Sequence, residues 1–294
     1  MTIRTMLIPH AGSEEMRPVL ELGLTLGRDL GAHVDVLHIQ SDPKDTIPLL
    51  GEGMSVSMIE DMIQIAKTEG GERASEGRKV FDKIVSGLSL ALSDDPATPG
   101  ASVSWSQEVG RNDEITARRG RLSDLIVVTR PTASSDVLAT LTLNAALFDS
   151  GRPVLVAPLA SGGDPLKPLS AGGHVAISWN GSAQSARAVG SAMGLIAKAG
   201  KVTVLTAASD RTSAARAPEL SAYLEWHGIV PDTRTFSSEG GQSIGESLLA
   251  ECGAADVDLL VMGAYTHSRV RQFILGGVTR HVLEHAALPL FMAH

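Results

Sequence analysis

The sequence predicts an α/β protein made of two tandem units, each with a five-stranded, mainly parallel sheet covered by helices on both faces. Short, continuously apolar segments such as DLLVM (258–262) alternate with longer segments of helical periodicity. Continuous apolarity is typical of parallel strands that are buried on both faces, and the alternation predicts right-handed crossovers in a doubly wound sheet. The same order of segments occurs twice along the chain, so each half is one copy of the unit.

The repeat is clearest in the strand patterns. The first pattern reads RTMLIPHAGS near the start and HVAISWNGS from His174, and the last reads GRPVLVAP and then ALPLFMAH. Between the copies lies the segment SGGDPLKPLSAGG, whose glycines, prolines and serines do not continue a helix or a central strand. We therefore assign residues 1–160 to an N-terminal domain, residues 161–172 to a linker and residues 173–294 to a C-terminal domain.

The elements of the second half follow from their local patterns. The strand at 232–237 is more polar than the others, which predicts a place at the sheet edge. Gly200 is predicted to close a helix as its left-handed cap. We predict strands at 174–178, 201–207, 232–237, 258–262 and 288–292, with helices at 182–199, 213–228, 243–255 and 276–286.

The first half differs by an insertion, PKDTIPLLGEGMSVSM (43–58), which is followed by a long helical stretch reaching about Leu92. A loop that leaves the carboxyl end of a strand is placed to cover a ligand, whereas an ordered surface insertion is the simpler interpretation.

Composition excludes several classes of function. The chain has 25 basic and 33 acidic residues, a net charge of −8, which argues against a large nucleic-acid surface. Its single cysteine, Cys252, excludes an intramolecular disulfide and any cysteine-cluster metal site. No apolar run approaches the roughly 18 to 20 residues of a membrane span, and no secretory signal is visible. We expect a cytoplasmic protein without membrane contact.

The segment GAYTHSRVRQFILGGVTRHVL (263–283) carries the main candidate site. Glycines at a strand end and at a helix start let backbone N–H groups approach an anion, and the helix N-terminus adds unsatisfied donors. Glycines at the same places also permit tight turns. Spacing alone does not decide between a phosphate loop and a turn.

The tandem arrangement and this loop resemble the universal stress protein (UspA) family, whose nucleotide-binding members carry G-x2-G-x9-G-[S/T] and an adenine nucleotide alpha hydrolase-like fold. Gly263 matches the first glycine and Gly276 the third, and Val278 and Thr279 match the segment that follows. Two positions depart, because Thr266 stands where the second glycine belongs and Gly277 replaces the Ser/Thr. Thr266 is the more serious departure, since a β-branched residue tolerates positive φ poorly.

The resemblance implies further contacts at the strand ends. Asn180 takes the position of the acidic residue that meets the nucleoside, and Ala207 supplies backbone atoms to the adenine edge. Met262 directly precedes the loop. The resemblance implies an adenine nucleotide, ATP with Mg²⁺, in the C-terminal domain, with no covalently bound cofactor. It implies a stress-response regulator and at most slow ATP hydrolysis, because no catalytic group is convincingly placed.

In this family the units pair through their last strands, which here are Val154 to Ala157 and Leu290 to Met292. We therefore expect an internal pseudo-dimer, with a homodimer of two chains left open. The first half has no glycine between Val128 and Gly151, so we expect no nucleotide there, and Arg130 is expected to be solvated.

Two alternatives remain. In the first alternative the protein is a nucleotide-independent interaction module or binds another small ligand, because Thr266, Gly277 and Asn180 all depart from the motif. In the second alternative the protein is a serine hydrolase. GGQSIGES fits a nucleophile elbow with Ser243 as nucleophile, and it is followed in the chain by Asp256 or Asp258 and by His267, His281 or His285. Ser243 and Glu246 also form a capping box, which is the favoured interpretation. His281 and His285 are spaced i, i+4, but no third metal ligand is evident, so no metal site is assigned.

Overall fold

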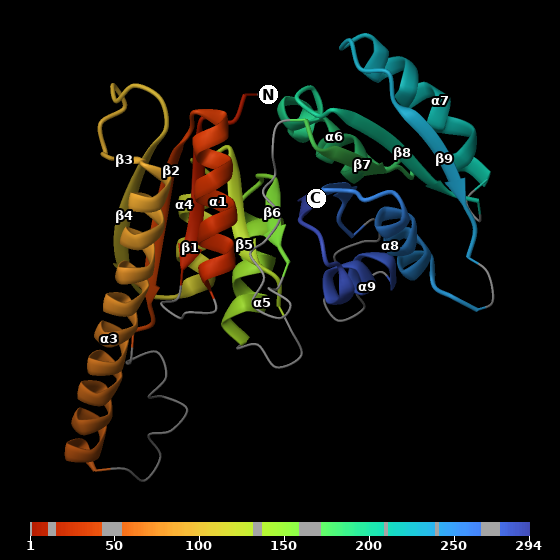
Figure 1. The fold of residues 1–294 in the computed structure, drawn as a ribbon. Helices are drawn as coiled ribbons and strands as arrows, with labels where there is room; N and C mark the ends of the chain where they lie inside the picture. The colour runs from red at the N-terminus through yellow and green to blue at the C-terminus, as the bar shows by residue number, and fades with distance from the viewer. Residues whose placement is uncertain are drawn as a thin grey trace.

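The computed structural model describes residues 2–10, 16–42, 55–131, 137–158, 172–208, 211–238, 241–265 and 277–294. Strands and helices alternate in both halves of the chain, which gives an α/β fold with helices on both faces of the sheet (Figure 1). We refer to β1–β6 as the N-terminal unit and to β7–β11 as the C-terminal unit.

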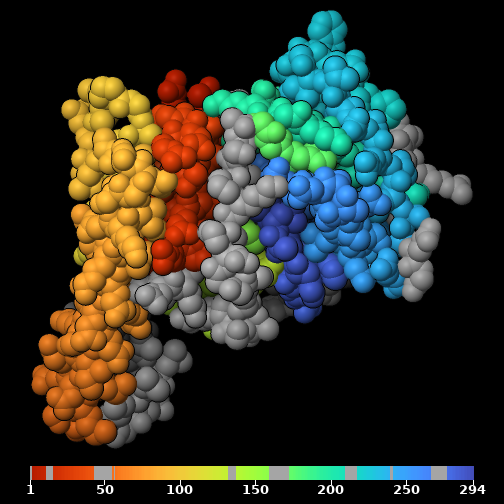
Figure 2. Space-filling view, in the orientation of Figure 1, coloured from red at the N-terminus to blue at the C-terminus, as the bar shows by residue number. Residues whose placement is uncertain are grey.

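In the N-terminal unit the elements follow the predicted alternation, with one short extra strand. Their bounds are β1 (Thr5–His10), α1 (Arg17–Leu30), β2 (His33–Gln40), α3 (Val56–Leu88), β3 (Ala91–Leu92), β4 (Ser102–Val109), α4 (Asn112–Gly120), β5 (Leu125–Thr129), α5 (Val137–Asn144), the π-helical segment η3 (Ala145–Asp149) and β6 (Val154–Ala157). Helix α3 ends at Leu88, with Ser89 in the left-handed region, and not near Leu92 as the sequence suggested. Its first turns project beyond the strands (Figures 1 and 2).

In the C-terminal unit each predicted element is present. Their bounds are β7 (His174–Ser178), α6 (Ala183–Ile196), β8 (Lys201–Ala207), α7 (Arg211–Glu225), β9 (Asp232–Phe236), α8 (Ile244–Ala254), β10 (Leu259–Gly263), α9 (Gly277–His285) and β11 (Leu290–Ala293). The expectation that Gly200 caps a helix was wrong. Helix α6 ends at Ile196, and Gly200 does not have a positive φ. A Cβ at Gly200 would clash with the carbonyl oxygen of Gly172, so close backbone packing explains the glycine.

The strands form one sheet of eleven, in the order β3-β4-β2-β1-β5-β6-β11-β10-β7-β8-β9. Neighbouring strands run parallel except at the junction of the units, where β6 and β11 are antiparallel and Phe291 lies opposite Leu155. These are the two strands that the family resemblance assigned to the junction. The polar strand β9 lies at the sheet edge, as its composition predicted.

Two apolar layers cover the sheet, and each crosses from one unit to the other. One layer joins α1 and α3 to α6 and α7, and the other joins α5 and η3 to α8 and α9. At the junction the fully buried Phe291 faces the first layer and Met292 the second. Burial of aliphatic side chains on both sides of β6 and β11 therefore holds the two units together.

No helix in the described part of the chain combines the length and the apolar composition that a membrane span requires.

Candidate functional site

The candidate site lies at the carboxyl ends of three adjacent strands. In the C-terminal unit the strand order is β10-β7-β8, so the chain winds from β7 in both directions. Ligands of doubly wound sheets bind outside the carboxyl ends at such a reversal. The fold brings the ends of these strands together, and with them Asn180, Ala207 and Gly263. The family resemblance assigned these residues to one site, and the topology places them at one edge of the sheet.

Gly263, the last residue of β10, is fixed by packing against helix α6. A Cβ at this position would lie 2.5 Å from the backbone nitrogen of Ser185 and 2.9 Å from the Cβ of Gln184. These atoms belong to the first turn of α6, which Ser182 caps by accepting a hydrogen bond from the Ser185 N–H at 3.1 Å. Close approach of a helix therefore requires glycine here, with or without a ligand.

Asn180 stands in the turn between β7 and α6. Its Oδ1 accepts a hydrogen bond from the Ser182 N–H at 3.1 Å, and Gly181 between them has a φ of 69°. This is the local turn that an asparagine side chain forms with the backbone two residues on. Ala207 is half-buried at the end of β8, whereas the Met262 side chain is 4% exposed and points into the core. Met262 can therefore offer a ligand only its backbone.

Helix α9 begins at Gly277, and its first turn combines an open backbone with a buried hydroxyl. Among the described residues, a Cβ at Gly277 would meet no atom within 4 Å, so none of their packing contacts requires this glycine. Thr279 is 6% exposed, and its Oγ1 accepts a hydrogen bond from the Tyr265 N–H at 3.4 Å. This hydrogen bond thus links the first turn of α9 to Tyr265, the second residue after β10. Thr266 and Gly276, the other two predicted loop residues, lie outside the described residues.

An open hollow lies between the N-terminal end of α8 and one face of α9. It is lined by Ser243, Ile244, Gly245, Gly277, Val278, Arg280, His281 and Glu284. Helix N-termini present unsatisfied N–H groups, and Arg280 adds positive charge, which Glu284 partly offsets through an ion pair of 2.7 Å. The arrangement favours an anion near Gly277.

Tyr265 is a site residue that sequence reasoning missed. It is a non-glycine residue at a φ of 53°, and burial raises the pKa of its phenol to about 12. The only signal in the sequence is its place two residues after Gly263, which does not reveal its conformation.

A family model matches part of the C-terminal unit. Residues 231–294, which contain β9, β10, the glycine loop and α9, match the model described as the universal stress protein family. The match covers 64 of the 294 residues, all of them in the C-terminal unit.

Solved structures extend the likeness in fold to the whole chain. A universal stress protein from Archaeoglobus fulgidus DSM 4304 superposes with a TM-score of 0.68 at 17% identity, covering 100% of this chain and 99% of that one. A functionally unknown protein from Pseudomonas aeruginosa PAO1 has a TM-score of 0.57 at 13% identity, covering 99% and 92%. The cytoplasmic domain of a prokaryotic cation chloride cotransporter has a TM-score of 0.51 at 11% identity, covering 99% and 96%. No curated protein matches the chain in sequence.

The residues of the alternative hydrolase triad are not brought together in the described part of the chain. Ser243 caps α8 by accepting a hydrogen bond from the Glu246 N–H at 3.1 Å. Asp258 lies beyond the other end of the 11-residue helix, where its Oδ2 accepts the His174 N–H at 2.7 Å. A helix of this length separates the two by about 16 Å. His267 lies outside the described residues. Within the described ranges no group of three metal-ligating side chains is present.

The corresponding edge of the N-terminal unit is filled by side chains. His10 ends β1 and His38 lies near the end of β2. Both are buried, and their rings contact Trp105 at centroid distances of 5.5 and 6.2 Å. The sequence expectation that Arg130 is solvated was wrong. Its guanidinium is half-buried and donates a hydrogen bond to the carbonyl oxygen of Ala286, across the junction of the units.

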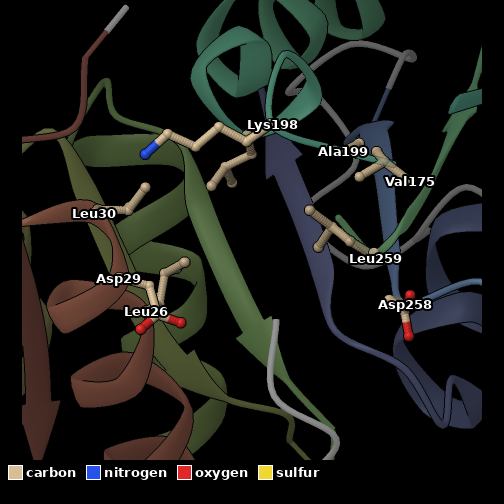
Figure 3. A pocket seen from close by; sticks show the side chains of 10 residues that line it. Leu26, Asp29, Leu30, Val175, Lys198, Ala199, Asp258 and Leu259 are labelled. Carbon is tan, nitrogen blue, oxygen red and sulfur yellow. The ribbon is translucent and has the colours of Figure 1, made fainter. Parts of the chain in front are cut away.

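A second hollow lies between α1 and α6 (Figure 3). Its lining includes Leu26 and Leu30 of α1, Lys198 beyond α6, and Val175 and Leu259 at the starts of β7 and β10. The amino ends of the strands border it, which is the opposite end from the glycine loop. It is therefore separate from the site described above.

Proposed function

We propose that the C-terminal unit binds an adenine nucleotide, ATP with Mg²⁺, and that the protein acts as a stress-response regulator and not as a fast catalyst. One observation carries this proposal: the segment that matches the family model also contains the start of α9, where Gly277 leaves the backbone accessible. The matched segment spans the glycine loop, and no atom of the described residues occupies the space where a side chain at Gly277 would lie.

The proposed pose follows from the chemistry of the edge. Phosphate oxygens lie at the first turn of α9, where N–H groups and the helix dipole favour negative charge. The nucleoside lies toward the ends of β7 and β8, where Asn180 and the backbone of Ala207 offer hydrogen-bonding groups. Mg²⁺ is held by the phosphates and water, as is usual for this ion.

The first experiment identifies what the purified protein carries. The protein is denatured, and any released small molecule is identified by chromatography and mass spectrometry. About one adenine nucleotide per chain is expected, and calorimetry with ATP is expected to show binding that weakens when Mg²⁺ is chelated.

A pair of variants at one position makes the test specific. Gly277→Val places a branched side chain in the space assigned to phosphate and is expected to abolish binding with little change in stability. Gly277→Ser supplies the hydroxyl of the family motif and is expected to bind at least as tightly as the natural chain. Equal binding by both variants would sink the site assignment.

The second candidate function is a nucleotide-independent interaction module, and a specific observation favours it. Gly263, Asn180 and Thr279 each have a structural task that needs no ligand: packing against α6, closing a turn and holding Tyr265. An empty protein that gives no calorimetric response to Mg-ATP would select this alternative. Residues 43–54 of the insertion 43–58, which leaves the carboxyl end of a strand and is placed to cover another ligand, lie outside the described residues.

A further inference from the structure

Ala264 and Tyr265, the first two residues after β10, are held in place from both units. Within the C-terminal unit, the Ala264 N–H donates to the carbonyl oxygen of Ala293 at 2.8 Å. The carbonyl oxygen of Ala264 accepts a hydrogen bond from Nδ1 of His294 at 3.0 Å. The next residue, Tyr265, donates its N–H to Thr279 on α9. Two successive residues therefore connect β10, β11 and the first turn of α9.

The N-terminal unit contributes Phe148, which lies in the π-helical segment η3. Its ring packs on Tyr265 at a centroid distance of 5.0 Å and edge-on against His294 at 4.9 Å. Phe148 therefore contacts the side chain of Tyr265, which follows Ala264, and that of His294, which hydrogen-bonds to the Ala264 carbonyl oxygen. Aromatic pairs at these separations attract each other beyond the gain from buried area. The contact crosses the junction of the units and reaches the residues directly after Gly263.

The conformation of Tyr265 shows why this contact matters. A bulky residue with positive φ is strained, and such a conformation persists only when its surroundings determine it. Here the surroundings are Phe148 on the ring and Thr279 on the backbone N–H. Without Phe148 the ring loses its partner from the N-terminal unit, and the backbone is expected to relax away from Thr279.

A second tie acts on the other end of α9. Arg130, which follows β5 of the N-terminal unit, donates from its guanidinium to the carbonyl oxygen of Ala286, directly after the last residue of α9. A cation is favourable at a helix C-terminus, where carbonyl groups lack partners within the helix. The N-terminal unit thus contacts both Tyr265, the second residue after β10, and the end of α9.

We propose that the N-terminal unit, which has no glycine loop of its own, positions Tyr265 and helix α9 of the C-terminal unit for ligand binding, through Phe148 and Arg130. The part that concerns a ligand rests on the nucleotide-binding function proposed above. Because binding and loop position are linked, the effect is reciprocal: a bound nucleotide strengthens the contact between the units. Phe148 and Arg130 are positioning residues, since neither lies at the first turn of α9.

The test compares Phe148→Ala with Leu147→Ala in the full chain. Leu147 is the neighbouring residue of η3, is 3% exposed and packs in the same apolar layer, so its truncation destabilises the same region without removing the ring from Tyr265. Phe148→Tyr serves as the conservative replacement. The two readouts are the affinity for Mg-ATP by calorimetry and the amide hydrogen exchange of Ala264 and Tyr265 without ligand.

Phe148→Ala is expected to weaken Mg-ATP binding by about threefold to tenfold and to speed exchange at Ala264 and Tyr265. Phe148→Tyr is expected to restore both, and Leu147→Ala to leave both near their natural values. Unchanged loop exchange in Phe148→Ala, or equal effects of Leu147→Ala, would overturn the proposal. If the natural chain does not bind Mg-ATP, the nucleotide function fails, while the exchange comparison still decides whether Phe148 positions the loop.

Discussion

Replacing Gly263 by alanine tests whether packing or a ligand fixes this glycine. The added Cβ would lie 2.5 Å from the Ser185 nitrogen and 2.7 Å from the carbonyl carbon of Gln184. Both are backbone atoms of α6, so the clash is not relieved by a side-chain rotation. The helix has to shift, together with its contacts to β10.

The magnitude follows from two opposing effects. Overpacking of this kind costs about 1–3 kcal/mol, while alanine reduces the freedom of the unfolded chain by about 0.4–1 kcal/mol. A net loss of about 1–2 kcal/mol is expected. With an unfolding entropy of about 2.1 cal/mol/K per residue, the 294-residue chain is expected to melt about 2–3 °C lower.

The assay is thermal and urea unfolding without nucleotide, with Gly277→Ala as the matched control. No atom of the described residues lies within 4 Å of a Cβ added to that glycine, so its replacement is expected to be neutral or to stabilise by up to about 1 kcal/mol. A Gly263→Ala variant that unfolds like the natural chain would refute the packing argument. A ligand would then be the better explanation for the glycine.

Three further predictions concern single side chains. Ser243→Ala removes the cap of α8 and is expected to cost about 1 kcal/mol in urea unfolding; a loss of esterase activity in this variant would instead revive the hydrolase. Burial lowers the pKa of His10 from 6.5 to about 4, and repulsion from His38 adds to the effect. Between pH 6.5 and pH 4 the unfolded state therefore binds a proton at His10 more readily than the folded state does. Stability is therefore expected to fall by about 2–3 kcal/mol from pH 7 to pH 4.5, and His10→Gln, compared by urea unfolding at both pH values, should lose most of this dependence. Burial raises the pKa of the Cys252 thiol to about 12, so the folded protein is expected to resist a colorimetric thiol reagent until it unfolds, and rapid native reaction would contradict this.

Most of the fold was predictable because parallel sheets leave a strong pattern. DLLVM and its counterpart DLIVV became the buried strands β10 and β5, and the polar segment 232–237 became the edge strand β9. The capping role of Ser243 was also confirmed, because a helix N-terminus is set by local hydrogen bonds. These features depend on neighbouring residues in the chain, so the sequence contains the information directly.

The site was predictable only in part. The resemblance located Gly263, Gly277 and Asn180 at the edge of the sheet, yet it did not reveal that helix α6 presses on Gly263. It gave no sign that Tyr265 adopts a positive φ or that Gly200 packs against Gly172. Each of these depends on a segment distant in sequence.

The sequence by itself determined the strand and helix order, the repeat and the position of the glycine loop, because hydrophobic periodicity and turn residues act locally. Only the tertiary structure decided that Arg130 hydrogen-bonds to the residue after α9 and that Phe148 packs on Tyr265 across the junction. Both contacts form because β6 and β11 pair antiparallel, which places the end of β5 beside the segment before β11, and the segment before β6 beside the end of β10. Pairing between strands more than a hundred residues apart is set by the whole fold.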